Sequence, residues 1–195
     1  MTDIREKLLE ATAQVFAQQG YLGCTTRRVA HEAGVNEVTL FRHFGSKDVL
    51  IREALTHVER STAAPLPEVP HDPQAELLEW AAKVHRNLAE QRTLIRRVLG
   101  EMVERPEIAP VVCDGAQGEH ACLRRYLEAL RRRGLATSAF DADGVTALLL
   151  GGLFGDAMMR DMMPSSMPVE AMLREFVRAT LAALGAVPTS TAGVA

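Results

Sequence analysis

Cysteines and aromatic residues are scarce in this sequence. Of its 195 residues three are cysteines, and tryptophan, tyrosine and phenylalanine together make up 5%. Cys24, Cys113 and Cys122 have no CxxC spacing, and their odd number suits a reducing compartment rather than a disulfide framework. Cys113, His120 and Cys122 lack a fourth ligand for a structural zinc ion. We therefore expect no metal site.

Long apolar runs and a strong net charge are also absent. The most apolar stretch, VTALLLGGLFGDAMM at 145–159, contains Asp156 and is followed by Arg160, so we do not expect it to span a membrane. The N-terminal segment MTDIREKLLEATAQ has charges among its apolar residues, unlike a targeting peptide. A formal net charge of −3 means that any basic surface must be local. We expect a soluble, cytoplasmic protein.

Helical periodicity, in contrast, is present along most of the chain. Hydrophobic residues make up 47% and charged residues 24%, an ordinary globular composition. Ile4, Leu8, Ala11 and Val15 fall on one face of a helix that Gly20 can end, and similar stripes recur to about residue 185. The pattern predicts an all-α protein of nine or so helices with no strand.

Prolines divide the chain. The segment STAAPLPEVPHDP at 61–73 has four prolines, which favours a junction between domains. Asp72 and Pro73 suit the N-cap and the first position of the helix that follows. The sequence thus predicts an N-terminal domain at 1–60, a linker at 61–73, a larger domain at 73–187 and a flexible tail at 188–195.

Tight turns join three short helices between about residues 25 and 60. Thr25 or Thr26 can cap the first, Asn36 the second and Ser46 the third, while Gly34 supplies the left-handed residue that ends the first. Two short helices joined by such a turn are typical of a helix-turn-helix. In that motif the first turn of the second helix meets base edges of DNA, and flanking groups bind phosphates.

The charge of this region supports that interpretation. Between residues 25 and 47 four basic residues stand against two acidic ones, 4 − 2 = +2, on a chain that is acidic as a whole. The six are Arg27, Arg28, Arg42 and Lys47, with Glu32 and Glu37. Threonine caps and solvated arginines also occur on other helical proteins, so a generic helical hairpin is the alternative.

Residues 16–50, FAQQGYLGCTTRRVAHEAGVNEVTLFRHFGSKDVL, closely resemble the DNA-binding signature of the tetracycline-repressor (TetR) family. The matching elements are Phe16, Gly20-Tyr21, Thr25-Thr26, Val29-Ala30, Ala33-Gly34-Val35, Thr39-Leu40, the aromatic residue at 41, His43-Phe44, Ser46-Lys47 and Leu50. The resemblance implies an all-helical homodimer. Each chain would have a three-helix DNA-binding domain at 1–60 and a larger domain that binds a small effector and dimerises.

The resemblance also implies which residues face DNA. Glu37, Val38 and Thr39 open the recognition helix, and Arg27 and Arg28 reach either a base edge or a phosphate. Positions that usually bind the DNA backbone are occupied by Thr25, Thr26, Phe41, His43 and Lys47. Asn36 and Arg42 complete the predicted interface.

Two positions depart from the family pattern. Phe41 stands where tyrosine is usual and has no hydroxyl for a phosphate, which leaves stacking against a sugar. Val38 replaces a small residue or proline, and it can touch a thymine methyl but cannot form a hydrogen bond. Glu37 has two readings, since it either accepts from a cytosine amino group or favours the helix dipole while repelling phosphates.

The larger domain contains a candidate dimer interface. Ala147, Gly151 and Gly155 share one helical face, and each helical glycine costs roughly 1 kcal/mol against alanine, which close helix packing would offset. With a stripe on the last helix, this face would form a four-helix interface. The stripe consists of Leu173, Phe176, Thr180 and Leu184. The alternative is that the glycines pack inside the monomer.

Methionines and aromatic residues suggest an effector pocket. Five of the eight methionines fall between residues 158 and 167, and methionine suits adaptable apolar pockets. The candidate lining residues are Trp80, Met102, Tyr126, Phe154 and Met158. The alternative is that these residues are simply core.

Catalysis has little support in the sequence. His31-Glu32 begins like HExxH, but Val35 stands where the second histidine is needed, and GGLFG and GAQG follow no strand. We therefore predict no enzyme and no cofactor. With what the resemblance implies, we predict a dimeric transcriptional repressor, released from a double-stranded DNA operator by a small hydrophobic effector. The alternative is a helical protein-interaction module without specific DNA binding.

Overall fold

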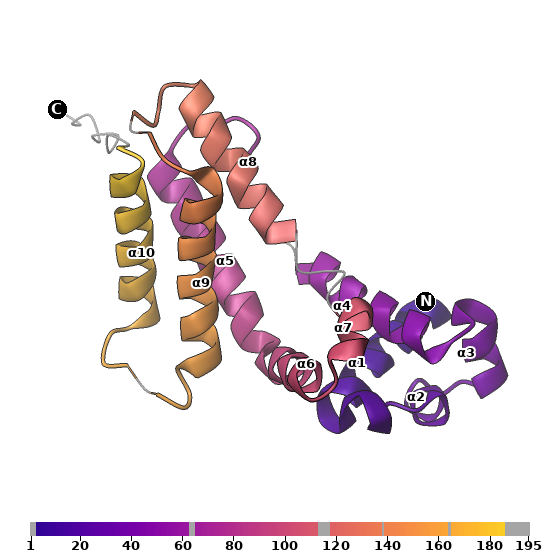
Figure 1. Ribbon diagram of the computed structural model, residues 1–195. Coiled ribbons are helices and arrows are strands. Elements are labelled where there is room, and N and C mark those ends of the chain that lie inside the picture. The colour runs from indigo at the N-terminus through magenta and orange to yellow at the C-terminus, as the bar shows by residue number, and fades with distance from the viewer. Residues whose placement is uncertain (1–2, 63–64, 113–117, 138, 164, 186–195) are drawn as a thin grey trace. The chain divides into compact units, whose positions relative to one another are not determined.

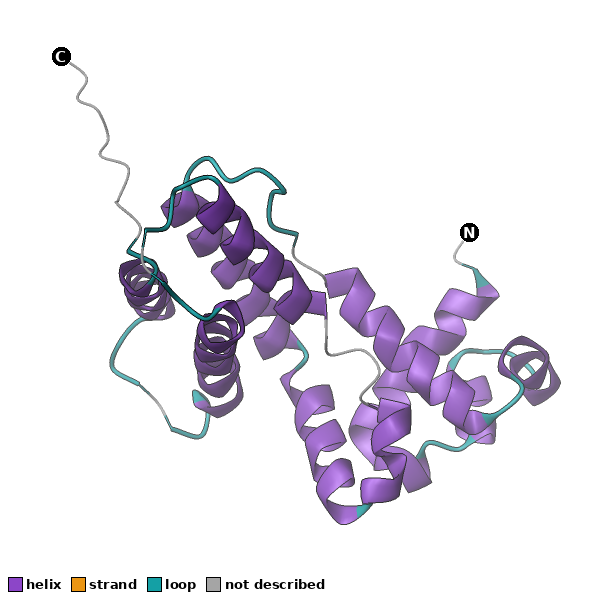
Figure 2. Cartoon of the chain, turned by 45° about the horizontal axis from the view of Figure 1, so that its top comes forward, coloured by secondary structure: helices purple, strands orange, loops and turns teal. Residues whose placement is uncertain are grey.

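The computed structural model describes residues 3–62, 65–112, 118–137, 139–163 and 165–185. Over these residues the chain forms helices and no strand, so the all-α fold is confirmed (Figure 1 and Figure 2). The elements are α1 (Ile4–Gly23), α2 (Thr26–Glu32), α3 (Glu37–Phe44), α4 (Lys47–Thr62), α5 (Pro73–Glu90), α6 (Arg92–Glu104), the 3-10 turn η1 (Pro106–Ile108), α7 (Ala109–Val112), α8 (Gly118–Arg132), α9 (Ala142–Met159) and α10 (Val169–Ala183). Two of these, η1 and α7, were not expected, because prolines break the helical pattern there.

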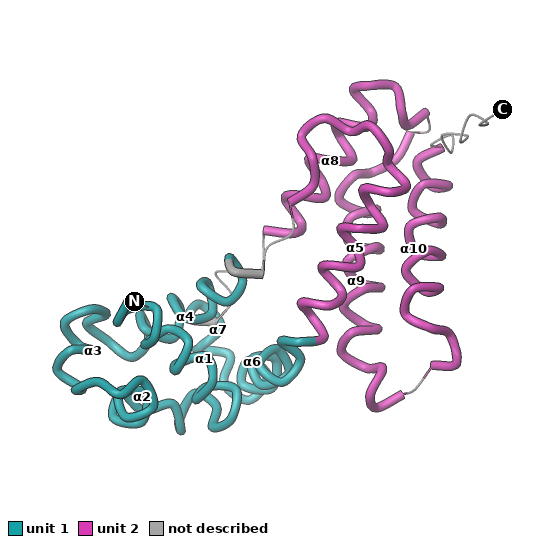
Figure 3. The backbone as a smooth tube through the Cα atoms, turned by 180° about the vertical axis from the view of Figure 1, so that it is seen from behind, with its two compact units in different colours: residues 1–63, 90–117 teal, residues 64–89, 118–195 magenta. Residues whose placement is uncertain are grey.

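The helices pack into two compact units (Figure 3). Unit 1 consists of residues 1–63 and 90–117, and unit 2 of residues 64–89 and 118–195. The chain first passes from one unit to the other within the proline-rich segment, but it returns to unit 1 at residue 90. Each unit is therefore built from two separate stretches of chain. The predicted tail at 188–195 lies outside the described residues.

Unit 1 is organised around α1, which packs against α4, α6 and α2. Its core holds Leu8 and Phe16 of α1, both fully buried, together with Leu50 and Ile51 of α4. Leu94 of α6 belongs to the same core. The predicted amphipathic face of the first helix is thus buried at Leu8, Ala11 and Val15, while Ile4 at its start is 46% exposed.

Unit 2 contains α5, α8, α9 and α10, with a separate core that includes Leu77, Trp80, Leu127 and Leu153. Its first helix starts as predicted, because α5 begins at Pro73 and the Asp72 Oδ1 atom accepts from the backbone N–H of Ala75 at 3.1 Å. Such an N-cap satisfies a backbone donor that has no partner within the helix.

Glu76 completes the start of α5. Its Oε1 atom accepts from the backbone N–H groups of His71 and Asp72 at 3.0 and 3.1 Å, a capping-box arrangement. Its other oxygen accepts from the Tyr126 hydroxyl at 2.5 Å, which ties α5 to α8. Burial, the hydrogen bond to Glu76 and the charge of Glu76 raise the pKa of Tyr126, so this tyrosine stays neutral and donates.

A polar cluster lies inside unit 2. The Asp156 carboxylate on α9 accepts from His85 Nε2 of α5 at 2.8 Å and from Arg160 at 2.6 and 2.8 Å. Arg160 also donates to the backbone oxygen of Met167 at 2.8 Å, which holds the chain that follows α9. Burial alone would raise the pKa of Asp156, but the hydrogen bonds and charges of Arg160 and His85 lower it below its usual value.

Replacing Asp156 with asparagine is expected to destabilise the protein by about 2–3 kcal/mol at pH 7, because charge-assisted hydrogen bonds are lost in a mostly buried place. A carboxylate whose pKa is lowered by folding stabilises the fold above its unfolded pKa of about 3.9, and this contribution disappears as the pH falls through the folded value. The difference in the free energy of unfolding between wild type and Asp156→Asn should therefore shrink below about pH 4, as urea unfolding at pH 7 and at lower pH would measure.

Glu175→Gln, which removes a fully exposed pair with Arg178, is the control and should leave stability unchanged. Equal losses at both pH values would contradict the role of the ionised carboxylate.

The most apolar helix is α9. In the described chain it is, by length and composition, the one helix that could cross a membrane, with a mean hydropathy of 1.2. Helices that pack within soluble helical proteins have the same properties. One side of α9 is buried in unit 2 through Leu149, Leu153 and Ala157. Its other side leaves Leu148 79% exposed.

Candidate nucleic-acid interface

The caps and turns of the helix-turn-helix form as predicted. Thr25, rather than Thr26, is the N-cap of α2, since its hydroxyl accepts from the backbone N–H of Arg28 at 3.3 Å. Asn36 caps α3 by accepting from the N–H of Val38 at 2.9 Å. Gly34 has φ +66° in the turn that separates the two helices, where a residue with a side chain is disfavoured.

The recognition helix α3 has eight residues, fewer than an isolated helix needs in water. Packing supports it instead, since Leu40 and Phe44 are buried one turn apart in the core of unit 1. The opposite face is open, with Val38 73% and Phe41 46% exposed. A short helix held on one side and open on the other suits a groove in DNA.

All of the residues predicted to face DNA lie on α2, on α3, at the start of α4 or at the caps of these helices. Eight are exposed and four are half-buried. The exposed ones are Thr25, Arg27, Arg28, Asn36, Val38, Phe41, Arg42 and His43, and the half-buried ones are Thr26, Glu37, Thr39 and Lys47. The structure therefore brings the predicted set together on one part of unit 1.

Glu37 makes a contact that the sequence did not predict. Its Oε1 atom accepts from the Thr26 hydroxyl at 2.5 Å, which links the first turn of α3 to the first turn of α2. This bond orients the carboxylate and fixes the distance between the two helix starts. One carboxylate oxygen of Glu37 and the exposed side chain of Val38 remain available at the start of α3.

Lys47 is held at the junction of α1 and α4. Its ammonium group donates to the backbone oxygen of Tyr21 at 2.5 Å and lies 4.1 Å from the centre of the Tyr21 ring. The Tyr21 hydroxyl in turn donates to Asp48 Oδ1 at 2.5 Å. That hydrogen bond, with burial and the charges of Asp48 and Glu107, raises the pKa of Tyr21 to about 12. The cation is thus oriented before any ligand arrives.

Glu101 of α6 anchors the same junction and is buried at 7% exposure. Its Oε1 atom accepts from the backbone N–H of Tyr21 at 2.9 Å, and its Oε2 atom accepts from Arg105 at 2.6 Å. The preceding Gly20 has φ +67°, and a Cβ atom there would overlap Glu101 Oε1. Glycine at this position is thus required both by the backbone conformation and by the close approach of α6.

No sequence pattern indicates this anchor. Tyr21 is part of the family signature, and Glu101 lies on a helix that is far away along the chain. Local patterns predict caps within a few residues, whereas the acceptor of the Tyr21 amide comes from 80 positions away. A contact of that kind depends on the tertiary fold alone.

A hollow of about 300 Å³ lies between α1 and α6 in unit 1. Its lining is mainly polar and charged, and consists of Ala17, Thr93, Arg96, Arg97, Gly100, Glu101 and Glu104. None of the residues predicted to bind an effector is among them.

The five predicted effector residues are not all in one unit. Trp80 and Tyr126 belong to the core of unit 2, where both are buried. Met158 is buried on α9 and Phe154 is 36% exposed. Met102 packs against the core of unit 1 instead. The alternative of an ordinary core position fits Trp80 and Tyr126, and Met102 is separated from the other four by unit.

The predicted dimer residues divide between an open and a closed face. On α9, Ala147 and Gly151 are exposed and Gly155 is half-buried. A Cβ atom added at Gly151 or Gly155 would meet nothing within 4 Å. These two glycines therefore leave space at the surface of unit 2. In contrast, Gly152 packs inside the unit, since a Cβ there would lie 2.9 Å from the ring of Phe176.

The predicted stripe on α10 faces the interior of unit 2 rather than its surface. Leu173, Thr180 and Leu184 are buried, and Phe176 is half-buried against α9. An apolar stripe indicates that a helix face is covered, but it does not identify the covering element. In this structure the stripe of α10 packs into the core of unit 2. Of these two helices, α9 has exposed large apolar side chains, Leu148 and Phe154, whereas the stripe of α10 is covered.

The capped helices α2 and α3, joined by the turn at Gly34, pack against α1 and α4 and leave one face of α3 exposed. This arrangement is a helix-turn-helix of the kind that binds DNA. Residues 8–54 match the family model of bacterial regulatory proteins, tetR family. Residues 8–54 therefore form a TetR-type helix-turn-helix domain, the DNA-binding part of transcriptional regulators of this family.

Relatives extend the likeness over the rest of the chain. The uncharacterized HTH-type transcriptional regulator YvkB of Bacillus subtilis (strain 168) is 24% identical over 176 residues, which cover 89% of this chain and 93% of YvkB. A TetR-family regulator from Rhodococcus sp. superposes with a TM-score of 0.77 at 16% identity, over 94% of this chain and 100% of that chain. The fatty acid degradation regulator FadR from Bacillus halodurans superposes with a TM-score of 0.68 at 16% identity, over 93% of this chain and 96% of the FadR chain.

Proposed function

We propose that this protein is a cytoplasmic, dimeric repressor that leaves its operator when a small apolar effector binds its larger domain. The observation that carries the proposal is the open face of α3 beside the oriented cation of Lys47. It supports a recognition helix in the major groove with phosphate contacts at its ends. We assign the DNA-binding role to residues 1–60 and the effector and dimer roles to 73–187.

The first turn of α3 is proposed to read the bases. Val38 is exposed enough to touch a thymine methyl, and Thr39 can form a hydrogen bond with a base edge. The Phe41 ring is exposed and has no hydroxyl, so its proposed role is stacking against a sugar. Specificity would then depend on few polar groups.

Dimerisation is proposed to use the open face of α9. Leu148, Ala147 and Gly151 form an exposed apolar surface, and the charged outer face of α10 is less suited to a stable interface. A two-fold dimer would present two recognition helices about one turn of DNA apart, roughly 34–36 Å. An effector that binds better to a different geometry of the dimer would shift this spacing and release DNA. The effector is proposed to be apolar because unit 2 has a largely apolar interior.

Leu148→Asp is expected to turn a dimer into a monomer at micromolar concentration, because a charge would be buried at the centre of the proposed interface. Size-exclusion chromatography with light scattering measures this. Val103→Asp is the matched control, since Val103 is an equally exposed apolar residue on α6, at 82%. A wild-type chain that is monomeric at this concentration, or a dimer that survives Leu148→Asp, would count against α9.

DNA footprinting tests the proposed function. The full chain, added at physiological salt to the DNA upstream of its own gene and to other candidate operators, should protect two half-sites about one turn of DNA apart. Protection of one half-site would contradict the dimer but not the DNA-binding role. No specific protection on any of these fragments would favour a protein-interaction module and would overturn the proposal.

A further inference from the structure

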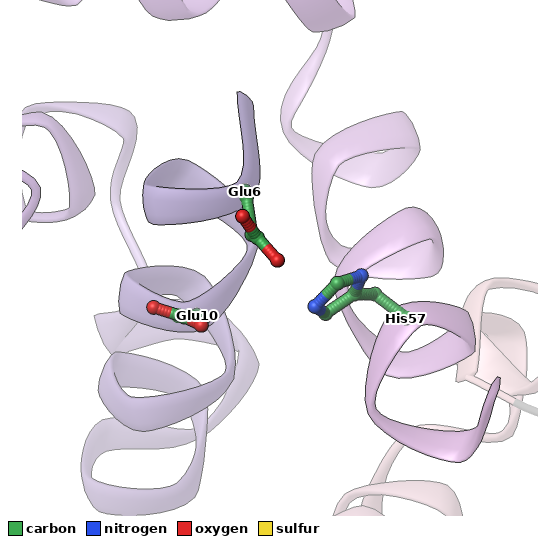
Figure 4. Close-up of side chains that lie close together, drawn as sticks. All are labelled: Glu6, Glu10 and His57. Atoms are coloured by element: carbon green, nitrogen blue, oxygen red, sulfur yellow. The ribbon is translucent and has the colours of Figure 1, made fainter. Parts of the chain in front are cut away.

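Three side chains that bind metals in other proteins converge on the surface of unit 1. Glu6 and Glu10 lie one turn apart on α1, and His57 lies on α4, which packs beside it. The carboxylate oxygens and the imidazole nitrogen of this cluster all lie within 4.8 Å of one another. Figure 4 shows the Glu6 carboxylate directed toward the His57 ring, with Glu10 on the next turn of the same helix.

Neighbouring residues that the structure describes do not pair with the side chains of this cluster. Within the described part of the chain, the side chains of Glu6, Glu10 and His57 have no hydrogen bond or ion pair, although the neighbouring Arg5 of α1 is paired with Glu53 of α4. Two carboxylates at i and i+4 on a helix repel each other. The cluster is therefore an unneutralised pair of negative charges that faces an imidazole, and a cation would remove the repulsion.

The donor set indicates the kind of cation. Imidazole suits zinc and similar first-row metals, whereas magnesium and calcium prefer oxygen ligands alone. A histidine with two carboxylates supplies three ligands and leaves the fourth position of a tetrahedral zinc ion to water. Zinc bonds of about 2.0–2.1 Å place tetrahedral ligand atoms about 3.3 Å apart. Small rotations of the two exposed glutamate side chains would close the cluster to that spacing while both helices stay in place.

We propose that Glu6, Glu10 and His57 form a surface site for zinc or a similar divalent first-row metal, which clamps the start of α1 to α4. The site shares no residue with the set assigned to DNA, and the inference does not rest on the proposed function. Because the three ligands come from two helices, the folded unit 1 binds the metal and the unfolded chain does not. The free energy of unfolding of unit 1 therefore increases with the logarithm of the metal concentration once that concentration exceeds the dissociation constant.

Titration of the chelator-treated full chain with Co²⁺ and Zn²⁺ tests the site. One Co²⁺ per chain should give a visible absorption band that Zn²⁺ displaces, and Zn²⁺ at micromolar concentration should raise the thermal unfolding midpoint. Glu6→Gln keeps the shape of an exposed side chain and should weaken binding at least about tenfold, as altered metal shells commonly do. His57→Ala should remove binding, with circular dichroism used to check that the variant is folded.

His120→Ala is the matched control, because His120 and Cys122 of α8 offer a different pair of metal ligands. This variant should bind Co²⁺ like the wild type. Binding that is lost in His120→Ala, or that persists unchanged in Glu6→Gln and His57→Ala, would overturn the assignment. The absence of any binding at micromolar metal would overturn it as well, and so would a response to Mg²⁺ equal to that to Zn²⁺.

Discussion

Replacing Gly20 with alanine is expected to destabilise unit 1 by about 3–4 kcal/mol and to abolish DNA binding at moderate temperature. A left-handed backbone costs a residue with a Cβ atom about 1–2 kcal/mol. The new Cβ would also displace the buried Glu101 carboxylate from the Tyr21 amide, a charged hydrogen bond worth about 1.5–3 kcal/mol. Urea unfolding of the full chain, followed together with DNA binding, measures both effects.

Substitutions at two other glycines separate the effect of backbone strain from the effect of displacing Glu101. Gly45 also has positive φ, at +72°, but a Cβ there would meet nothing within 4 Å, so Gly45→Ala should show the backbone strain alone. Gly100 lies within α6 with open space around it, and Gly100→Ala should be neutral or stabilising by up to about 1 kcal/mol. If Gly20→Ala cost no more than Gly45→Ala, Glu101 would have no anchoring role.

Replacing Lys47 with alanine is expected to weaken binding to all DNA sequences alike. A cation that contacts one phosphate releases about one counterion, so the slope of log K against log salt should fall by about 0.9. Titrations of operator and non-operator DNA at several salt concentrations measure this. Thr39→Ala should instead weaken binding at a subset of base positions and leave the salt slope unchanged.

Lys83→Ala is the control for Lys47→Ala, because Lys83 is an exposed lysine of unit 2. It removes the same charge from the chain and should leave DNA affinity unaltered. An unchanged affinity and salt slope in Lys47→Ala would show that the ammonium serves only to hold Tyr21, and that its phosphate role is wrong.

Local chemistry explains what could be predicted from the sequence. Thr25, Asn36 and Asp72 have side chains that accept from backbone groups two or three residues ahead, so spacing alone was enough to place three helix starts. The eight-residue α3 was foreseen for the same reason. The exposure of Val38 and Phe41 follows from the periodicity that buries Leu40 and Phe44.

The contacts that could not be predicted from the sequence depend on which helices pack against each other in the fold. Glu101 looks like any helical glutamate until α6 is placed against the end of α1, where it becomes the acceptor for Tyr21. The stripe of α10 indicates a covered face, and α9 of the same unit covers it, a pairing that the sequence of α10 alone cannot identify. His85 and Asp156, which lie on α5 and α9, are separated by 71 positions and had no pattern in common.

The discontinuity of unit 1 has a consequence for the order of events during synthesis. A chain that emerges N-terminus first completes the recognition helix early, yet Leu94 and Glu101 are made only after α5 of unit 2 has been released. Until then the Tyr21 amide lacks its acceptor, and part of the α1 surface has no cover. At about 5–20 residues per second this interval lasts several seconds. The protein therefore acquires a finished DNA-binding surface only after it has begun its second unit, and a fragment that ends at residue 62 would remain in the unfinished state.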